Sequence, residues 1–211
     1  MIYLKRILFL FIMTMLMASA ALADVSKQQQ FLLSLESGSK NIHSISSNFT
    51  QKSYISLFAD TMESKGKFTF SKPDNLRWEY SSPFVSGFLL KGSTGLKWDE
   101  AAAEPTPFST QTSPEMAVIS QQILAWTTMN MTWLSSTYSI KMINYSPPVM
   151  ELSPKSKTAK SFLSLIKIFF SPDSRYLQGI ELHEPDGDYT KIKFSDVIIN
   201  GNIATEIFEK R

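Results

Sequence analysis

Few residues of this 211-residue chain have the types and spacing that catalysis requires. His43 and His183 are its two histidines, and the lack of cysteine excludes disulfides, Cys-ligated metal sites and thiol catalysis. The sequence has no G-x-S-x-G nucleophile turn, no H-E-x-x-H zinc motif and no glycine-rich phosphate loop. The acidic stretch 184–188 lacks calcium-loop spacing and indicates a polar hairpin turn. We therefore predict no catalytic residue, metal site or cofactor; a glycosidase-type carboxylate pair stays open, with no residues selected for it.

Large apolar residues at regular spacing are the remaining signal. They allow two interpretations, an ordinary hydrophobic core or the wall of a cavity for acyl chains, to which flexible Met side chains would adapt. Composition does not separate the two, with 43% hydrophobic and 12% aromatic residues. The candidate lipid-binding residues are Phe49, Met62, Phe68, Phe70, Leu76, Trp78, Phe88, Leu90 and Trp98 on predicted strands, and Met116, Ile119 and Ile123 on a predicted helix.

The elements that must position these residues are mostly strands. Apolar and polar residues alternate with the period of two that is typical of a strand with one buried face. Alternation predicts strands around 44–52, 62–70 and 76–80, and at 84–91, 95–100, 137–144, 148–153, 162–171, 176–184 and 188–198, with a short strand near 203–208. Helical spacing predicts a helix over 26–37 that stops at Gly38 and a helix from Ser113-Pro114 to about 126, with Ser113 as N-cap. A short helical piece would include Met129 and Trp133, and 101–113 is predicted to be a loop.

These elements predict a mainly β (α+β) fold. Short connections between strands require antiparallel pairing, and a single apolar face leaves the other face in water. Ten or eleven such strands curl and enclose a space that something must fill. The helix at 114–126, with loops on both sides, is the expected plug or lid over a hydrophobic cavity.

The first 23 residues have the three parts of a secretory signal peptide. Lys5 and Arg6 precede an apolar stretch over 7–17, and Ala21-Leu22-Ala23 fits a cleavage site after Ala23. The competing interpretation, a membrane anchor, needs about 20 apolar residues. We therefore expect an exported protein with a single domain over 24–211, in the periplasm if the source is a Gram-negative bacterium. The formal net charge of +2 equals the contribution of Lys5 and Arg6, so the remainder is neutral, which argues against nucleic-acid binding.

Two stretches resemble the periplasmic outer-membrane lipoprotein carrier family (LolA-like). One is SISSNFTQK at 44–52; the other is GKFTFSKPDNLRWEY at 66–80, where the family has a Gly, an apolar alternation, Arg-Pro and then Arg-Trp. The resemblance covers most of residues 25–208. It implies an incomplete antiparallel β-barrel of about eleven strands covered by two to three helices. It also implies that the family's Arg before the Pro latches the helical lid; Lys72 stands at that position here and is the latch candidate.

The function implied by this resemblance is a periplasmic carrier that binds lipoprotein acyl chains. It would take lipoproteins from an inner-membrane ABC transporter to an outer-membrane lipoprotein receptor, without catalysis and as a monomer. Three alternatives stay open: a LolA-like carrier of another lipid or glycolipid, an envelope interaction protein that carries no cargo, and a periplasmic hydrolase.

Overall fold

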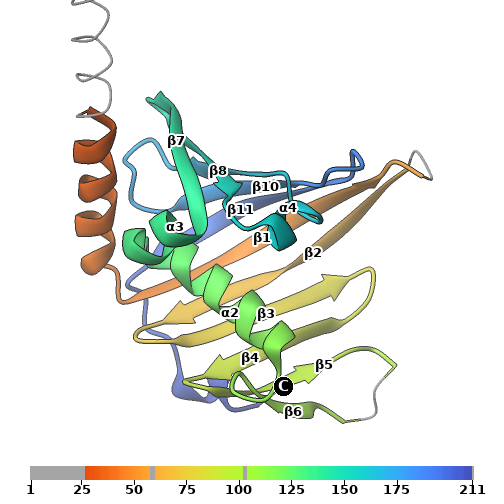
Figure 1. Cartoon of the computed structure of the whole chain (residues 1–211). Helices are drawn as coiled ribbons and strands as arrows, with labels where there is room; N and C mark the ends of the chain where they lie inside the picture. Colours follow the sequence, from red (N-terminus) through yellow and green to blue (C-terminus); the bar gives the residue numbers. More distant parts are fainter. Residues whose placement is uncertain (1–26, 58–59, 102–103, 211) are drawn as a thin grey trace, which may run out of the picture.

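The computed structural model describes residues 27–57, 60–101 and 104–210, and its main element is one curved antiparallel sheet (Figure 1). The predicted signal peptide and its cleavage site lie outside the described residues. The strands are β1 Ser44–Ile55, β2 Asp60–Ser71, β3 Asn75–Ser82, β4 Ser86–Lys91, β5 Thr94–Trp98, β6 Thr106–Ser109, β7 Tyr138–Tyr145, β8 Pro148–Pro154, β9 Leu165–Phe170, β10 Leu177–His183 and β11 Tyr189–Ile199. Their order, β6-β5-β4-β3-β2-β1-β11-β10-β9-β8-β7, leaves β6 and β7 unpaired with each other. The predicted open barrel of about eleven antiparallel strands is confirmed.

The strand order forces one connection to cross the sheet. The chain builds the sheet outward from β1 to β6, then begins again at the opposite end with β7 and returns to pair β11 with β1. The segment between β6 and β7 forms α2 Pro114–Thr127 and α3 Met131–Thr137, and α2 lies across the inner face of the sheet (Figure 1). The remaining helices are a helix over residues 27–40, α4 Lys157–Lys160 and the 3-10 turn η1 Thr205–Phe208. Among the described residues no helix combines the length and hydropathy needed to cross a membrane.

Two sequence predictions about β-structure are wrong. Residues 101–113 are not all loop, because β6 lies within them; Pro107 is tolerated there because β6 is the last strand of the sheet and pairs only with β5. The strand expected near 203–208 is instead η1, in which Phe208 is 3% exposed and packs against the outside of β3 and β4. Arg77 fixes this turn because its Nη1 donates to the carbonyl oxygen of Ile207 at 2.9 Å.

The expected helix boundaries also change. Gly38 does not end the first helix, which continues to Lys40. Ser113 is extended, as an N-cap should be, but its side chain makes no capping hydrogen bond; its carbonyl oxygen accepts from the Ala117 N–H at 3.0 Å. The strand predicted from residue 162 begins later, at Leu165, because the short helix α4 precedes it.

The outer face of the sheet carries a row of charged residues that keeps it in water. Cross-strand register aligns one charged residue from each of six neighbouring strands: Glu151, Lys167, Glu181, Lys191, Lys52 and Glu63. Three neighbouring pairs in this row form ion pairs, Lys167–Glu151 at 3.5 Å, Lys191–Glu181 at 3.1 Å and Lys52–Glu63 at 3.5 Å. Such exposed pairs stabilise a sheet by well under about 1 kcal/mol each, so their main effect is to fix which face is wet.

The inner face of the same strands is apolar and forms the core. Its most deeply buried side chains include Phe70, Leu76, Leu152, Ile168 and Ile180, each at most 2% exposed. The sheet end at β7 is covered by the first helix. Gln28 bonds the β7 backbone twice: its Nε2 donates to the Ile140 carbonyl oxygen at 3.2 Å, and its Oε1 accepts from the Met142 N–H at 3.0 Å. This pairing blocks an edge that could otherwise recruit another strand.

Gly66 tests how tightly the inner face is packed. A Cβ at Gly66 would collide with the Glu79 carbonyl oxygen and with the Phe49 ring that lies over it. We expect Gly66→Ala to lower the free energy of unfolding by about 1–3 kcal/mol, as overpacking does. Gly38→Ala is the control, because Gly38 is helical with nothing within 4 Å and should gain about 0.5–1 kcal/mol. Urea denaturation measures the free energy of unfolding of both variants. Equal changes in the two would contradict close packing of Phe49 over Gly66.

Candidate functional site

Two apolar spaces lie between α2 and the inner face of the sheet. We call them the closed cavity and the open groove, and they share a wall formed by Trp78, Ile123 and Trp126. Trp78 comes from β3, whereas Ile123 and Trp126 come from α2, so the partition is made jointly by the sheet and the helix that crosses it.

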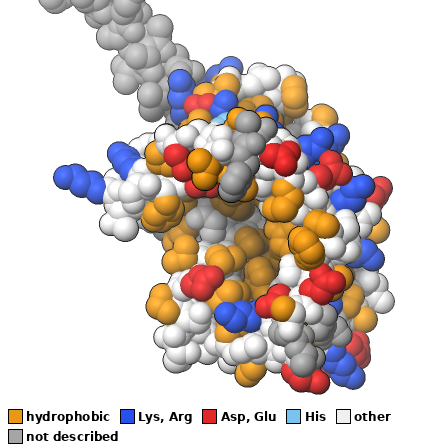
Figure 2. Space-filling model, turned by 90° about the vertical axis from the view of Figure 1, so that its right-hand side faces the viewer, with side chains coloured by type: hydrophobic (Ala, Val, Ile, Leu, Met, Phe, Trp, Pro, Cys, Tyr) orange, Lys and Arg blue, Asp and Glu red, His pale blue; other side chains and the backbone are white. Residues whose placement is uncertain are grey.

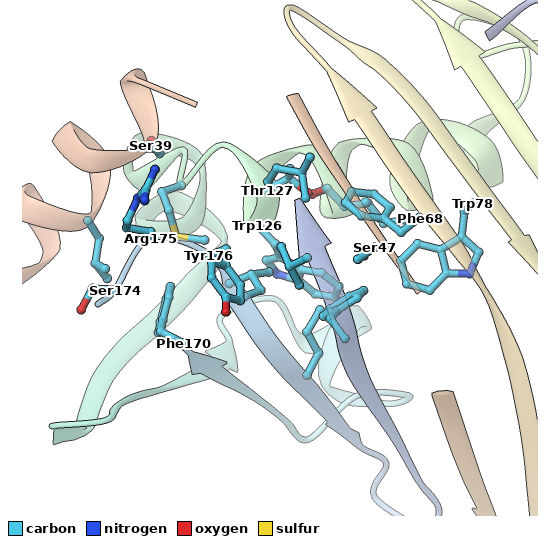
Figure 3. A pocket seen from close by; sticks show the side chains of 18 residues that line it. Ser39, Ser47, Phe68, Trp78, Trp126, Thr127, Phe170, Ser174, Arg175 and Tyr176 are labelled. Carbon is cyan, nitrogen blue, oxygen red and sulfur yellow. The ribbon is translucent and has the colours of Figure 1, made fainter. Parts of the chain in front are cut away.

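The closed cavity has a volume of about 30 Å³, which is room for one or two water molecules. It is lined by Leu35, Ser39, Ile45, Ser47, Phe68, Trp78, Ile123, Trp126, Thr127, Met129, Phe170, Ser174, Arg175, Tyr176, Leu177, Ile180, Phe194 and Val197. Figure 3 shows Ser47, Phe68 and Trp78 at one end, Arg175 and Phe170 at the other, and Trp126 between them. As it stands, this cavity is too small for an acyl chain.

The open groove is larger, about 530 Å³, within the usual size range of ligand pockets. It is lined by Gln51, Trp78, Tyr80, Gly87, Phe88, Ile119, Gln122, Ile123, Trp126, Phe162, Leu163, Ile166, Leu182, Glu184, Thr190 and Ile192. Two of these side chains are exposed to an unusual degree for large apolar groups, Phe162 at 59% and Ile119 at 37%. The space-filling view shows a hollow with hydrophobic side chains inside it and around its rim (Figure 2). This arrangement can bind a flexible apolar chain.

The shared wall links the two spaces. Because Ile123 and Trp126 both belong to α2, a movement of this helix away from the sheet would join the closed cavity to the open groove. The capacity for apolar ligand therefore depends on the position of α2.

Two polar contacts hold α2 in its observed position. The Tyr138 hydroxyl, at the start of β7, donates to Gln122 Oε1 at 2.6 Å. Burial raises the pKa of Tyr138, against a smaller opposite effect of the Gln122 hydrogen bond, so the hydroxyl remains a donor at neutral pH. At the C-terminal end of α2, Ser39 Oγ lies 2.7 Å from the Thr128 carbonyl oxygen and 2.8 Å from that of Glu36, and the two oxygens share its one proton. One contact therefore ties α2 to the sheet and the other ties its end to the first helix.

Lys72, the predicted latch, reaches α2 only indirectly. Its Nζ donates to the carbonyl oxygens of Lys40 at 2.7 Å and Ser39 at 3.2 Å, which are the last residues of the first helix. A cation at this end of a helix is favourable because the terminal carbonyls lack partners and the helix dipole is negative there. Lys72 thus fixes the helix whose Ser39 side chain contacts Thr128.

Several of the predicted lipid-binding residues come together here. Phe68, Trp78 and Ile123 line the closed cavity, and Phe88 and Ile119 line the open groove together with Trp78 and Ile123. Phe49, Phe70, Leu76 and Leu90 belong to the core beneath these spaces and line neither of them.

Three predicted residues lie elsewhere. Met62 lies on the inner face of the sheet near the start of β2, where it is 49% exposed. Met116 is buried on α2 but lines neither space. The expectation that Trp98 faces the same side as Trp78 is wrong, because Trp98 pairs with Gly87 and lies on the outer face. There its ring lies 5.1 Å from the Arg77 guanidinium.

The last three strands, β9 to β11, also contribute to the walls of the two spaces, which was not predicted from the sequence. Phe170, Ile180, Ile192 and Phe194 line the two spaces as fully as the residues of β1–β4. Their alternation was visible in the sequence, but only the pairing of β1 with β11 brings them onto the same face as Phe68. Ser47, which also lines the closed cavity, was not predicted as a site residue either.

The two histidines lie away from both spaces. His183 Nε2 is 3.2 Å from Glu181 Oε2 in the outer charged row, and His43 precedes β1, where its backbone N–H donates to Asn200 Oδ1 at 2.7 Å. Burial would raise the pKa of Glu181, but its contacts with Lys191 and His183 outweigh that effect and lower it. Over the described ranges, acidic and histidine side chains form no group able to hold a metal ion.

Comparison with known proteins agrees with this architecture. A model of the family described as "Outer membrane lipoprotein carrier protein LolA" matches residues 40–211, which confirms the resemblance predicted from residues 44–52 and 66–80. The outer-membrane lipoprotein carrier protein of Francisella tularensis subsp. novicida is 24% identical over 170 residues, covering 81% of this chain and 78% of that protein. The protein of the same name from Neisseria meningitidis serogroup C is 25% identical over 197 residues, covering 93% and 87%.

A solved structure of low sequence identity has the same fold. It is an uncharacterized conserved protein from Thermus thermophilus, with a TM-score of 0.55 and 6% identity, and the match covers 87% of this chain and 94% of that one. This similarity concerns the fold alone.

Replacing Lys72 tests its role at the first helix. We expect Lys72→Leu to lower the free energy of unfolding by about 0.3–1 kcal/mol and to speed amide hydrogen exchange over residues 36–42. Lys72→Arg, which keeps the cation, should restore the wild-type pattern. Unchanged exchange in Lys72→Leu would contradict the contacts with Ser39 and Lys40.

Replacing Tyr138 tests the contact that holds α2. Tyr138→Phe removes the hydrogen bond to Gln122, so we expect a loss of about 1 kcal/mol and faster exchange within α2. Burial raises the pKa of Tyr138 in the folded state above the ordinary value of 10.0, so the folded state favours the neutral hydroxyl. The stability that depends on this neutral form is fully present below pH 10 and is lost as the pH rises further. The alkaline loss of stability should therefore be smaller in Tyr138→Phe than in the wild type. Identical alkaline curves would argue against burial of the hydroxyl, and unchanged exchange within α2 would argue against its hydrogen bond to Gln122.

Proposed function

The chain belongs to the outer membrane lipoprotein carrier (LolA) family, and on that premise we propose that it is a periplasmic carrier of lipoproteins. In this proposal the acyl chains of the cargo enter the open groove and extend beneath α2 into the closed cavity. The protein acts by binding and has no catalytic step. The observation that carries the proposal is the apolar groove of about 530 Å³, which lies under a helix held by few polar contacts.

The energetics of acyl binding favour a partial enclosure. Burying acyl chain contributes about 0.8 kcal/mol per CH₂, so enclosing three chains of about 16 carbons would contribute on the order of 38 kcal/mol. Non-covalent affinities saturate near about 20 kcal/mol, and a carrier must also release its cargo. A groove that leaves much of each chain exposed, beneath a helix that can move, meets both requirements.

The remaining parts of the proposal concern the route. We place the start of transport at an inner-membrane ABC lipoprotein transporter, which would load the groove, and its end at an outer-membrane lipoprotein receptor. The signal peptide at 1–23, with cleavage after Ala23, would deliver the chain to the periplasm, where it would act as a monomer. Lys72 would support the lid through the first helix rather than by direct contact with α2.

Neighbouring residues of α2 provide a matched test of the groove. Ile119 lines the groove at 37% exposure, whereas Val118 is 64% exposed and lines neither space. We expect Ile119→Glu to weaken binding of a triacylated lipopeptide roughly tenfold, because burying an aliphatic side chain contributes about 1.5–3 kcal/mol. Val118→Glu should change it by less than about twofold. Displacement of an environment-sensitive hydrophobic dye measures both affinities.

The same assay distinguishes the other functions. If the dye binds and is displaced by another lipid but not by the lipopeptide, the protein is a carrier whose cargo is that lipid and not a lipoprotein. Binding of neither dye nor lipid, together with recovery of a partner protein on the purified chain, would contradict the carrier and favour an envelope interaction protein.

A further inference from the structure

Two hydrogen-bond donors are buried in the closed cavity without a partner. Ser47 on β1 is 7% exposed and Trp126 on α2 is 6% exposed, and both side chains line the cavity. Within the described part of the chain, neither Ser47 Oγ nor Trp126 Nε1 has a hydrogen-bond partner. Burying a donor without an acceptor is unfavourable, so such groups call for an explanation.

From these two donors we propose that the cavity binds the carbonyl group of an acyl ester or amide. This inference rests on the proposed function, and it adds that the protein recognises a polar atom of the cargo as well as its hydrocarbon. In this arrangement the chain lies along the apolar walls, and its carbonyl oxygen accepts hydrogen bonds from Trp126 Nε1–H and Ser47 Oγ–H.

The chemistry of the cavity selects a neutral acceptor. The Trp126 indole can only donate, so its partner must have a lone pair. The lining contains a single charged side chain, Arg175, and Figure 3 shows it at the end opposite Ser47. An anion at the Ser47 end would therefore be buried without a countercharge, which is strongly disfavoured. The strongest neutral acceptor of an acyl group is the oxygen of its ester or amide carbonyl.

The positions of the two donors also connect cargo to the lid. Ser47 belongs to the sheet, paired with Phe68 of β2, whereas Trp126 belongs to α2 and forms part of the wall between cavity and groove. A carbonyl oxygen has two lone pairs and can accept two hydrogen bonds, one from each element. Once α2 has moved to admit the chain, bound ester would contact both the sheet and α2 through these donors, and an alkyl chain without a carbonyl would not.

The test compares two neutral lipids that differ in their carbonyl groups. The probes are 1,2-dioctanoylglycerol, a diester, and 1,2-di-O-octylglycerol, its ether counterpart, each displacing the hydrophobic dye from the full chain. We expect Trp126→Phe and Ser47→Ala each to raise the Kd of the ester about 3- to 10-fold and to change the Kd of the ether by less than about twofold. Trp78→Phe is the control: Trp78 lines the same cavity, but its indole N–H is not one of the buried donors without a partner, so both lipids should be affected by the same factor.

A second measurement needs no substitution in the binding protein. In the ¹⁵N-labelled wild type, the Trp126 indole N–H resonance should move downfield with the ester and not with the ether; Trp126→Phe serves only to assign the signal. Equal Kd changes for ester and ether in the variants, or equal indole shifts with both lipids, would overturn the carbonyl site and leave the carrier intact. Failure of the wild type to bind either lipid would also overturn the carbonyl site, whereas the carrier is overturned only if the triacylated lipopeptide does not bind either.

Discussion

The structure depends on one constraint: an open sheet with a single apolar face has to bury that face with its own connections. The outer row from Glu63 to Glu151 is charged and stays in water, so the inner face must be covered. The strand order leaves the long connection between β6 and β7 to do this, since those strands are the two ends of the sheet and the segment joining them has to cross it. Covering the core and bridging the sheet are therefore performed by the same helix, α2 (Figure 1).

A single helix covers a broad curved sheet incompletely, and the site follows from this. The spaces left between α2 and the sheet are the open groove and the closed cavity, which Trp78, Ile123 and Trp126 separate. Apolar packing places α2 over the core, while Tyr138 and Ser39 set its position through two hydrogen bonds. Individual hydrogen bonds contribute only about 0.5–1.5 kcal/mol net, and an acyl chain beneath α2 would replace the apolar contacts that the moving helix gives up. Cargo can therefore compete with the closed arrangement.

Local sequence pattern predicted the strands and many inward-facing residues, because period-two alternation is a property of each strand alone. It placed Phe68 and Trp78 correctly on the inner face. It failed at Trp98 because the apolar residues of β5, Leu96 and Trp98, lie on the outer side of the sheet, where Leu89, Trp98 and Phe208 of η1 are buried. Alternation within one strand does not show on which side of the sheet an apolar face lies. The register between paired strands shows it.

The pairing of β1 with β11, which brings Phe194 opposite Phe49, joins segments far apart in the sequence and has no local signal. The motif at Lys72 likewise identified a residue of structural importance without indicating that its partners are the last carbonyls of the first helix.

The central claim is that acyl chains of lipoproteins occupy the space beneath α2. Native mass spectrometry of the protein purified without detergent from its own cell envelope tests it most directly, because the bound species is identified by its mass. The account predicts a complex with an acylated lipoprotein or its lipid-modified terminus, which dissociates in the gas phase to release fatty-acyl fragments. A chain recovered free of acylated molecules, under conditions in which a lipid carrier of the same envelope retains its cargo, would contradict the account.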